Sequence, residues 1–95
     1  MKNFVENRSF AKMVKEDGKE KRITNEANRN LTHAFHHHTG KRSRQIYVYA
    51  PTKSVLDIEV DYESQRSSIK TVELGSYLEC MEYVTSADEN PITLT

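Results

Sequence analysis

Residues 45–63 read QIYVYAPTKSVLDIEVDYE, and this stretch predicts a β-hairpin. In both halves, residues of one kind recur at every second position, which is the period of a strand. The residues Pro51-Thr52-Lys53-Ser54 between them favour a turn, and the proline prevents the first strand from continuing. We therefore expect antiparallel strands over residues 45–50 and 55–63, with Ile69–Leu74 as a third, less regular strand.

The same alternation assigns side chains to the two faces of each strand. In the first strand, Ile46 and Val48 are expected on one face and Tyr47 and Tyr49 on the other. In the second strand we expect the apolar residues to face the core, and these are Leu56, Ile58, Val60 and Tyr62. We expect its acidic residues, here called the acidic ladder, to face solvent, and these are Asp57, Glu59 and Asp61.

The N-terminal half has helical rather than β periodicity. With about 100° per residue, the apolar residues between Ile23 and His38 form one stripe about 120° wide, as in a half-buried helix. Thr24 is a suitable N-cap for this helix, and Gly40 can end it in the left-handed conformation. A shorter helix is predicted near residues 4–16, and the charged run Lys15–Arg22 is typical of a solvated loop.

Residues 77–84 suit either a short helix or a strand. Ser76 and Glu79 form a capping-box pair and Tyr77, Cys80 and Val84 have helical spacing, so we expect a short helix. The expected fold class is α+β, with one or two N-terminal helices packed on a small antiparallel sheet of about three strands. We expect a single domain over residues 1–95, in which residues 1–22 can be a flexible basic arm and residues 86–95 a disordered tail.

Size and composition limit the class of protein. A chain of 95 residues has room for one core, and only 36% of its residues are hydrophobic, which favours either a homodimer that shares its core across an interface or a flexible N-terminal part. The single cysteine, Cys80, excludes an internal disulfide and is expected to be buried and unreactive. No apolar stretch suits a signal peptide or a membrane span, so we expect a cytoplasmic protein without a membrane partner.

The net charge of zero conceals a division between the two halves of the chain. Residues 1–45 carry 11 basic and 5 acidic side chains, whereas residues 46–95 carry 3 basic and 9 acidic ones. Such asymmetry indicates nucleic-acid binding or self-association. Because basic side chains neutralise phosphates and exposed tyrosines stack on unpaired bases, we expect a small nucleic-acid-binding accessory protein, with RNA favoured. The expected binding residues are Arg22, Arg29, His33, His36, His37, Lys41, Arg42, Arg44, Tyr47 and Tyr49.

Two other hypotheses explain the same charges. In one, the protein is an inhibitor or adaptor of the kind that mobile genetic elements encode, and the acidic ladder masks a basic site on a target protein. In the other, the basic and acidic halves pair with each other, within a chain or between chains, and the tyrosines belong to the core. The carboxylates of the ladder follow one strand and do not converge on a point, so they predict no metal site.

The histidines raise the question of metal binding. On the expected helix His33, His36 and His37 would converge on one side. Zinc needs three or four ligands, usually with cysteine in a structural site, and the chain offers no second cysteine. We therefore predict no metal site and no other cofactor.

A histidine-based ribonuclease is the enzymatic alternative. His33 or His37 would act as general base, Arg29 or Lys41 would stabilise the phosphorane charge, and Tyr47 would donate a proton. The run Arg29-Asn30-x5-His36 resembles the Arg-polar-x-His signature of HEPN-type ribonucleases, an all-helical family, but its spacing differs and residues 45–74 predict strands. We favour a binding protein over an enzyme and assign no catalytic residue.

Overall fold

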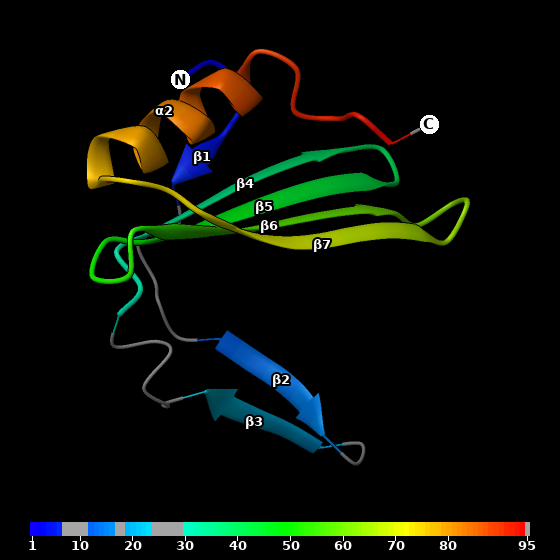
Figure 1. Cartoon of the computed structure of the whole chain (residues 1–95). Coiled ribbons are helices and arrows are strands. Elements are labelled where there is room, and N and C mark those ends of the chain that lie inside the picture. Colours follow the sequence, from blue (N-terminus) through cyan, green and yellow to red (C-terminus); the bar gives the residue numbers. More distant parts are fainter. Residues whose placement is uncertain (7–11, 17–18, 24–29, 95) are drawn as a thin grey trace.

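The computed structural model describes residues 1–6, 12–16, 19–23 and 30–94. Its strands are β1 (Val5–Glu6), β2 (Lys12–Glu16), β3 (Lys19–Ile23), β4 (His33–Thr39), β5 (Arg42–Tyr49), β6 (Ser54–Asp61) and β7 (Arg66–Glu73). Five of them form an antiparallel sheet in the order β1-β4-β5-β6-β7, and β2 and β3 form a separate two-stranded sheet (Figure 1). Helix α2 (Tyr77–Asp88) lies across one face of the five-stranded sheet (Figure 1).

The predicted N-terminal helices and three-stranded sheet were wrong. Residues 4–16 contribute β1 and β2, and the second half of the expected helix over 24–39 is β4, while residues 24–29 lie outside the described residues. Helical periodicity is weak evidence in a short segment, and pairing with distant strands overrides it. In β4, which lies between β1 and β5, Ala34 and Phe35 are buried in different clusters on the two faces of the sheet. Neighbouring apolar residues that suited one helical stripe therefore serve both faces of a strand.

The hairpin predicted from residues 45–63 is confirmed as β5 and β6, and most of Ile69–Leu74 lies in β7. The register of β5 and β6 runs from Arg42 opposite Asp61 to Tyr49 opposite Ser54. Gly40 has a left-handed φ of 56°, but it lies in the two-residue turn between β4 and β5 and not at the end of a helix. Glycine at the first position of such a turn allows the chain to reverse within two residues.

Helix α2 begins at the predicted capping box and continues to Asp88. Ser76 Oγ accepts a hydrogen bond from the Glu79 N–H (3.2 Å), and the Glu79 carboxylate accepts one from the Gly75 N–H (2.9 Å). Residues 86–88, which we expected to begin the tail, therefore belong to the helix. Among the described residues, no helix has the length and apolar character needed to cross a membrane.

The main core lies between α2 and the sheet. Its buried members are Phe4, Phe35, Ile46, Val48, Val55, Cys80 and Val84. Cys80 is fully buried, as predicted, and burial raises the pKa of its thiol, which disfavours the reactive thiolate. A smaller cluster, formed by Leu31, Ala34 and Tyr47, occupies the opposite face of the sheet.

Candidate functional site

The side chains that face α2 change from apolar to charged along the strands. The register places Val48, Val55 and Val72 in one row across β5, β6 and β7, and it places Arg44 beside Glu59 further along. Val55 and the three residues of the acidic ladder all occupy odd-numbered positions of β6, and such positions share one face of a strand. The ladder therefore faces the helix side and not solvent. Its three carboxylate residues are only 3–4% exposed, so the predicted orientation of β6 was wrong. The apolar residues predicted to face inward are half-buried on the opposite face, except Tyr62, which is exposed.

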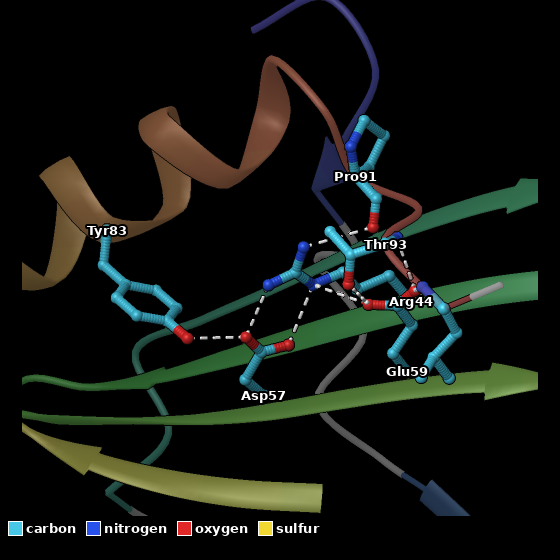
Figure 2. Close-up of polar contacts among 7 residues, drawn as sticks. Arg44, Asp57, Glu59, Tyr83, Pro91 and Thr93 are labelled. Atoms are coloured by element: carbon cyan, nitrogen blue, oxygen red, sulfur yellow. Dashed lines mark hydrogen bonds and ion pairs between the residues drawn. The ribbon is translucent and has the colours of Figure 1, made fainter. Parts of the chain in front are cut away.

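Arg44 and Asp57 form a two-pronged ion pair beneath α2 (Figure 2). Arg44 Nε donates to Asp57 Oδ1 (2.9 Å), Arg44 Nη2 donates to Asp57 Oδ2 (2.6 Å), and the Tyr83 hydroxyl of α2 donates to the same Oδ2 (2.6 Å). Burial opposes ionisation of Asp57, but the hydrogen bonds from Arg44 and Tyr83 prevail and lower the pKa of this carboxyl. Burial and the bond to Asp57 raise the pKa of Tyr83 to about 12. The sheet and the helix are therefore joined through one carboxylate.

Glu59 and Arg44 attach the chain end to the sheet (Figure 2). Glu59 accepts hydrogen bonds from the Thr93 N–H (2.6 Å), the Thr93 hydroxyl (2.7 Å) and the Leu94 N–H (2.6 Å). Arg44 Nη1 donates to the Pro91 carbonyl oxygen (3.1 Å). Residues 91–94, which we expected in a disordered tail, thus cover the charged part of the sheet.

Asp61 ends the acidic ladder at the turn between β6 and β7. Its carboxylate accepts hydrogen bonds from the N–H groups of Glu63 (3.0 Å) and Ser64 (3.3 Å) and lies 3.3 Å from Arg42 Nε. The backbone donors of the turn, together with the Arg42 charge, lower the pKa of Asp61. This carboxylate therefore stabilises a turn and a cross-strand ion pair.

A fourth buried carboxylate, Asp88 at the end of α2, binds the N-terminus of the chain. It accepts hydrogen bonds from the N–H groups of Lys2 (2.6 Å), Asn3 (3.0 Å) and Phe4 (2.6 Å). Although burial opposes ionisation, these donors prevail and lower the pKa of Asp88. The contact positions Phe4 in the main core.

These buried carboxylates all have structural partners within the fold. In the part of the chain that the structure describes, every buried side-chain nitrogen or oxygen has a hydrogen-bond partner. Their partners are strand, helix and terminal residues, so these carboxylates hold the elements of the fold together. The acidic ladder is also not the exposed surface that the inhibitor or adaptor hypothesis required.

Two residues expected to bind nucleic acid, Arg44 and Tyr47, are also buried. The Tyr47 hydroxyl donates to Gln45 Oε1 (2.7 Å), and only 7% of Tyr47 is exposed. Tyr49 is half-buried against the same cluster, and burial raises the pKa of both tyrosines. These rings do not form the exposed stacking platform that the sequence suggested.

His33 lies on the helix side of β4 between two polar partners. One ring nitrogen, Nδ1, lies 2.7 Å from Glu6 Oε1, and the other, Nε2, lies 2.6 Å from the Tyr77 hydroxyl. The ring also stacks on Phe35, with a centroid distance of 5.7 Å. His33 therefore connects β1, β4 and the first turn of α2.

The other histidines do not converge with His33 on one site. His37 shares its face of β4 and donates from Nδ1 to the Asn3 carbonyl oxygen (3.3 Å), whereas His36 lies on the opposite face. The His36 ring lies 6.5 Å from the His38 ring. Among the described residues, no three histidine, cysteine or acidic side chains could hold a metal ion together.

The remaining predicted contacts lie near the β4–β5 turn and in β3. Lys41 is exposed in the turn, and the side chain of Arg42 is 43% exposed although it pairs with Asp61. Arg22 lies on β3, where it pairs in register with Met13, and Arg29 lies outside the described residues. The ten predicted residues thus do not form one continuous surface within the described chain.

The β2–β3 hairpin is a basic element that the sequence analysis missed as a strand pair. Its ten strand residues include five cations, Lys12, Lys15, Lys19, Lys21 and Arg22, and two carboxylates, Glu16 and Glu20. The sequence signal was the dipeptide Asp17-Gly18, which is typical of a two-residue hairpin loop. The surrounding charged run instead predicts a solvated loop.

Comparison of the chain with protein-family models, with curated proteins and with solved structures gives no match. The basic hairpin and the basic β4–β5 turn are therefore the features from which a binding function can be argued.

Proposed function

We propose that the protein binds nucleic acid through phosphate groups, with the β2–β3 hairpin as the main contact and Lys41 and Arg42 as a second one. The observation that carries this proposal is the charge of the hairpin strands, where five cations outnumber two carboxylates. Lysine and arginine that neutralise phosphates release the condensed counterions, and this release drives association.

The register of the hairpin concentrates the excess charge. Both carboxylates stand opposite lysines, since Lys15 pairs with Glu20 and Lys19 pairs with Glu16. The other three cations stand opposite apolar residues, and these pairs are Lys12 with Ile23, Lys21 with Val14, and Arg22 with Met13. Pairing across the ladder therefore leaves three positive charges without a directly opposite carboxylate.

The acidic half of the chain supports the proposal because part of its charge is used inside the fold. Of the nine acidic residues in 46–95, four are buried, namely Asp57, Glu59, Asp61 and Asp88. They bind Arg42, Arg44 and backbone or hydroxyl donors. The negative charge that would repel a phosphate backbone is thereby reduced at the surface.

Burial of Tyr47 determines the expected mode of binding. Because Tyr47 is buried and Tyr49 is half-buried, the predicted stacking pair is not exposed, and we expect the contacts to go mainly to the phosphates, which carry no direct sequence information. We therefore expect affinity that depends steeply on salt and weakly on sequence. The preference for RNA over DNA stays a prediction.

Fluorescence anisotropy tests the proposal with labelled single-stranded RNA and with DNA of the same sequence. We expect binding whose log–log salt dependence becomes less steep by about 2 in the triple variant Lys12→Gln, Lys21→Gln, Arg22→Gln, because each lost contact with a single strand accounts for about 0.7. A matched triple variant, Lys2→Gln, Lys53→Gln, Lys70→Gln, removes the same charge from exposed positions outside the hairpin. An equal decrease of the salt dependence in both variants would overturn the proposal. The absence of binding to either nucleic acid at low salt would also overturn it.

A further inference from the structure

We propose that the outer edge of β7 is the interface of a symmetric homodimer, in which β7 pairs antiparallel with β7 of a second copy. The two five-stranded sheets would then form one continuous ten-stranded sheet. This inference goes beyond the proposed function and does not depend on it. It rests on the hydrogen-bonding phase, the exposure and the charges of the edge.

β7 is a long strand with one side unpaired among the described strands. All eight residues from Arg66 to Glu73 pair with β6, and β7 is the last strand in the order of the sheet. The Leu74 N–H donates to the Lys53 carbonyl oxygen (2.8 Å), which continues the β6–β7 ladder and fixes its phase. In an antiparallel ladder, alternate residues direct their N–H and C=O groups to the partner. The even-numbered residues of β7 therefore bond to β6, and the odd-numbered ones point outward.

The outward backbone groups belong to residues that suit self-association. These residues are Ser67, Ile69, Thr71 and Glu73. Their side chains lie on the face away from α2, because Ile69 stands opposite Ile58, which packs on the cluster of that face. Ile69 is 68% exposed, the largest exposed fraction among the large hydrophobic residues described. Natural edge strands are commonly protected by charges or proline, and the centre of this outer row has neither.

A two-fold axis perpendicular to the sheet places odd-numbered residues of one β7 opposite odd-numbered residues of the other, and even-numbered opposite even-numbered. The same axis keeps both α2 helices on one face of the joined sheet. With the axis at Ile69, this residue faces Ile69 of the second copy, and Ser67 faces Thr71 of the second copy. These odd-numbered pairs bring outward donors and acceptors together and give about six hydrogen bonds.

Charge selects this register over its neighbours. An axis at Lys70 places Lys70 opposite Lys70 of the second copy, and an axis at Ser68 places Arg66 opposite Lys70 of the second copy. Like charges that stand directly opposite each other destabilise a ladder. With the axis at Ile69, Lys70 stands opposite Ser68 and Arg66 opposite Val72, so no two cations are paired.

Cysteine scanning tests both the interface and its register. Single variants Ser68→Cys, Ile69→Cys, Lys70→Cys and Thr71→Cys are oxidised with copper–phenanthroline, and covalent dimers are counted on a non-reducing gel. Only the residue on the axis meets its own copy at the Cα separation of about 5.5 Å that suits a disulfide. We expect the most rapid cross-linking at position 69, and none in the wild type, because Cys80 is fully buried.

A charge substitution tests the interface without cross-linking. Ile69→Lys places two ammonium groups at the axis and should weaken dimerisation about tenfold or more in sedimentation equilibrium. Leu78→Lys is the matched control, since Leu78 is 66% exposed and belongs to α2 and not to the edge strand. Circular dichroism verifies that both variants keep the fold.

Several results would overturn the proposal. A wild type that stays monomeric at high concentration, a dimer that survives Ile69→Lys, or cross-linking that is fastest at another position would each contradict it. A monomer whose β7 instead captures an extended peptide would also do so, because it would make the edge a site for a foreign strand.

Discussion

Arg44 forms its two-pronged ion pair with Asp57, which lies diagonally across the β5–β6 ladder, and not with Glu59, which stands directly opposite. Arg44 Nε lies 4.0 Å from Glu59 Oε1, compared with 2.9 Å from Asp57 Oδ1. The diagonal arrangement leaves both oxygens of Glu59 to accept hydrogen bonds from Thr93 and Leu94. Arg44 itself also donates to Pro91, so one guanidinium connects two strands with the chain end.

Replacing Arg44 with methionine should lower the free energy of unfolding by about 3–5 kcal/mol, because it leaves the buried Asp57 without its ion-pair partner. Arg44→Lys keeps the charge but loses the two-pronged geometry, so its stability should lie between those of Arg44→Met and the wild type. Urea unfolding followed by circular dichroism measures this order.

Lys41→Met is the matched control, since Lys41 is an exposed cation in the turn that precedes β5. We expect a change within about 0.5 kcal/mol. Similar stability of Arg44→Met and Lys41→Met would show that the buried ion pair does not stabilise the fold.

Asp88→Asn should weaken the attachment of the N-terminus to α2. The carboxylate accepts from three backbone N–H groups, and replacing it with an amide should cost about 1–3 kcal/mol. Hydrogen exchange should become faster at residues 2–4 before it changes at Val48 in the core. Glu89→Gln, at the exposed neighbouring position, should leave the free energy of unfolding and the exchange rates unchanged. Uniform acceleration across the chain would indicate global destabilisation and contradict a local attachment.

Acidification should destabilise the protein. The pKa values of Asp57, Asp61 and Asp88 are lowered in the fold, so the stability that they contribute is present above the unfolded value of about 3.9 and is lost as pH falls through the folded values. The urea midpoint of the wild type should therefore decrease between about pH 5 and pH 2. Asp88→Asn lacks one of these groups and should show a shallower decrease. Parallel profiles for the two proteins would exclude a contribution from Asp88.

The elements that the sequence predicted correctly have local signals. The alternation in β5 and β6 and the capping box of α2 each lie within a few residues. β4 lacked such a signal, because its strand character depends on pairing with β1 and β5 rather than on its own periodicity. The hairpin of β2 and β3 had a local signal at Asp17-Gly18, which the surrounding charge concealed.

The buried charges could not be predicted from neighbouring residues. Asp57 is bonded to Tyr83, 26 residues away, and Glu59 to Thr93, 34 residues away. Without these distant partners a carboxylate belongs in solvent, so the sequence of the acidic ladder predicts an outward orientation. Arg44 did carry a usable signal, because it occupies an even-numbered position of β5, as Ile46 and Val48 do. Alternate residues of a strand share one face, and Ile46 and Val48 belong to the core.

Alkaline pH should destabilise the protein through Tyr83. The pKa of Tyr83 is raised to about 12 in the fold from an unfolded value of about 10, so its contribution is complete below about pH 10 and is lost as pH rises towards 12. Tyr47, Tyr49 and Cys80 also have raised pKa values, so the informative quantity is the difference between the wild type and Tyr83→Phe.

We expect Tyr83→Phe to be less stable than the wild type by about 1–2 kcal/mol at pH 8, because Asp57 loses a hydrogen-bond donor. This difference should diminish between about pH 10 and pH 12, where the wild type loses the contribution of the Tyr83 hydroxyl. Tyr62→Phe, at an exposed position, is the matched control and should follow the wild type throughout. Because the argument depends on a hydroxyl that donates to Asp57, a Tyr83→Phe difference that stays constant up to pH 12 would contradict it.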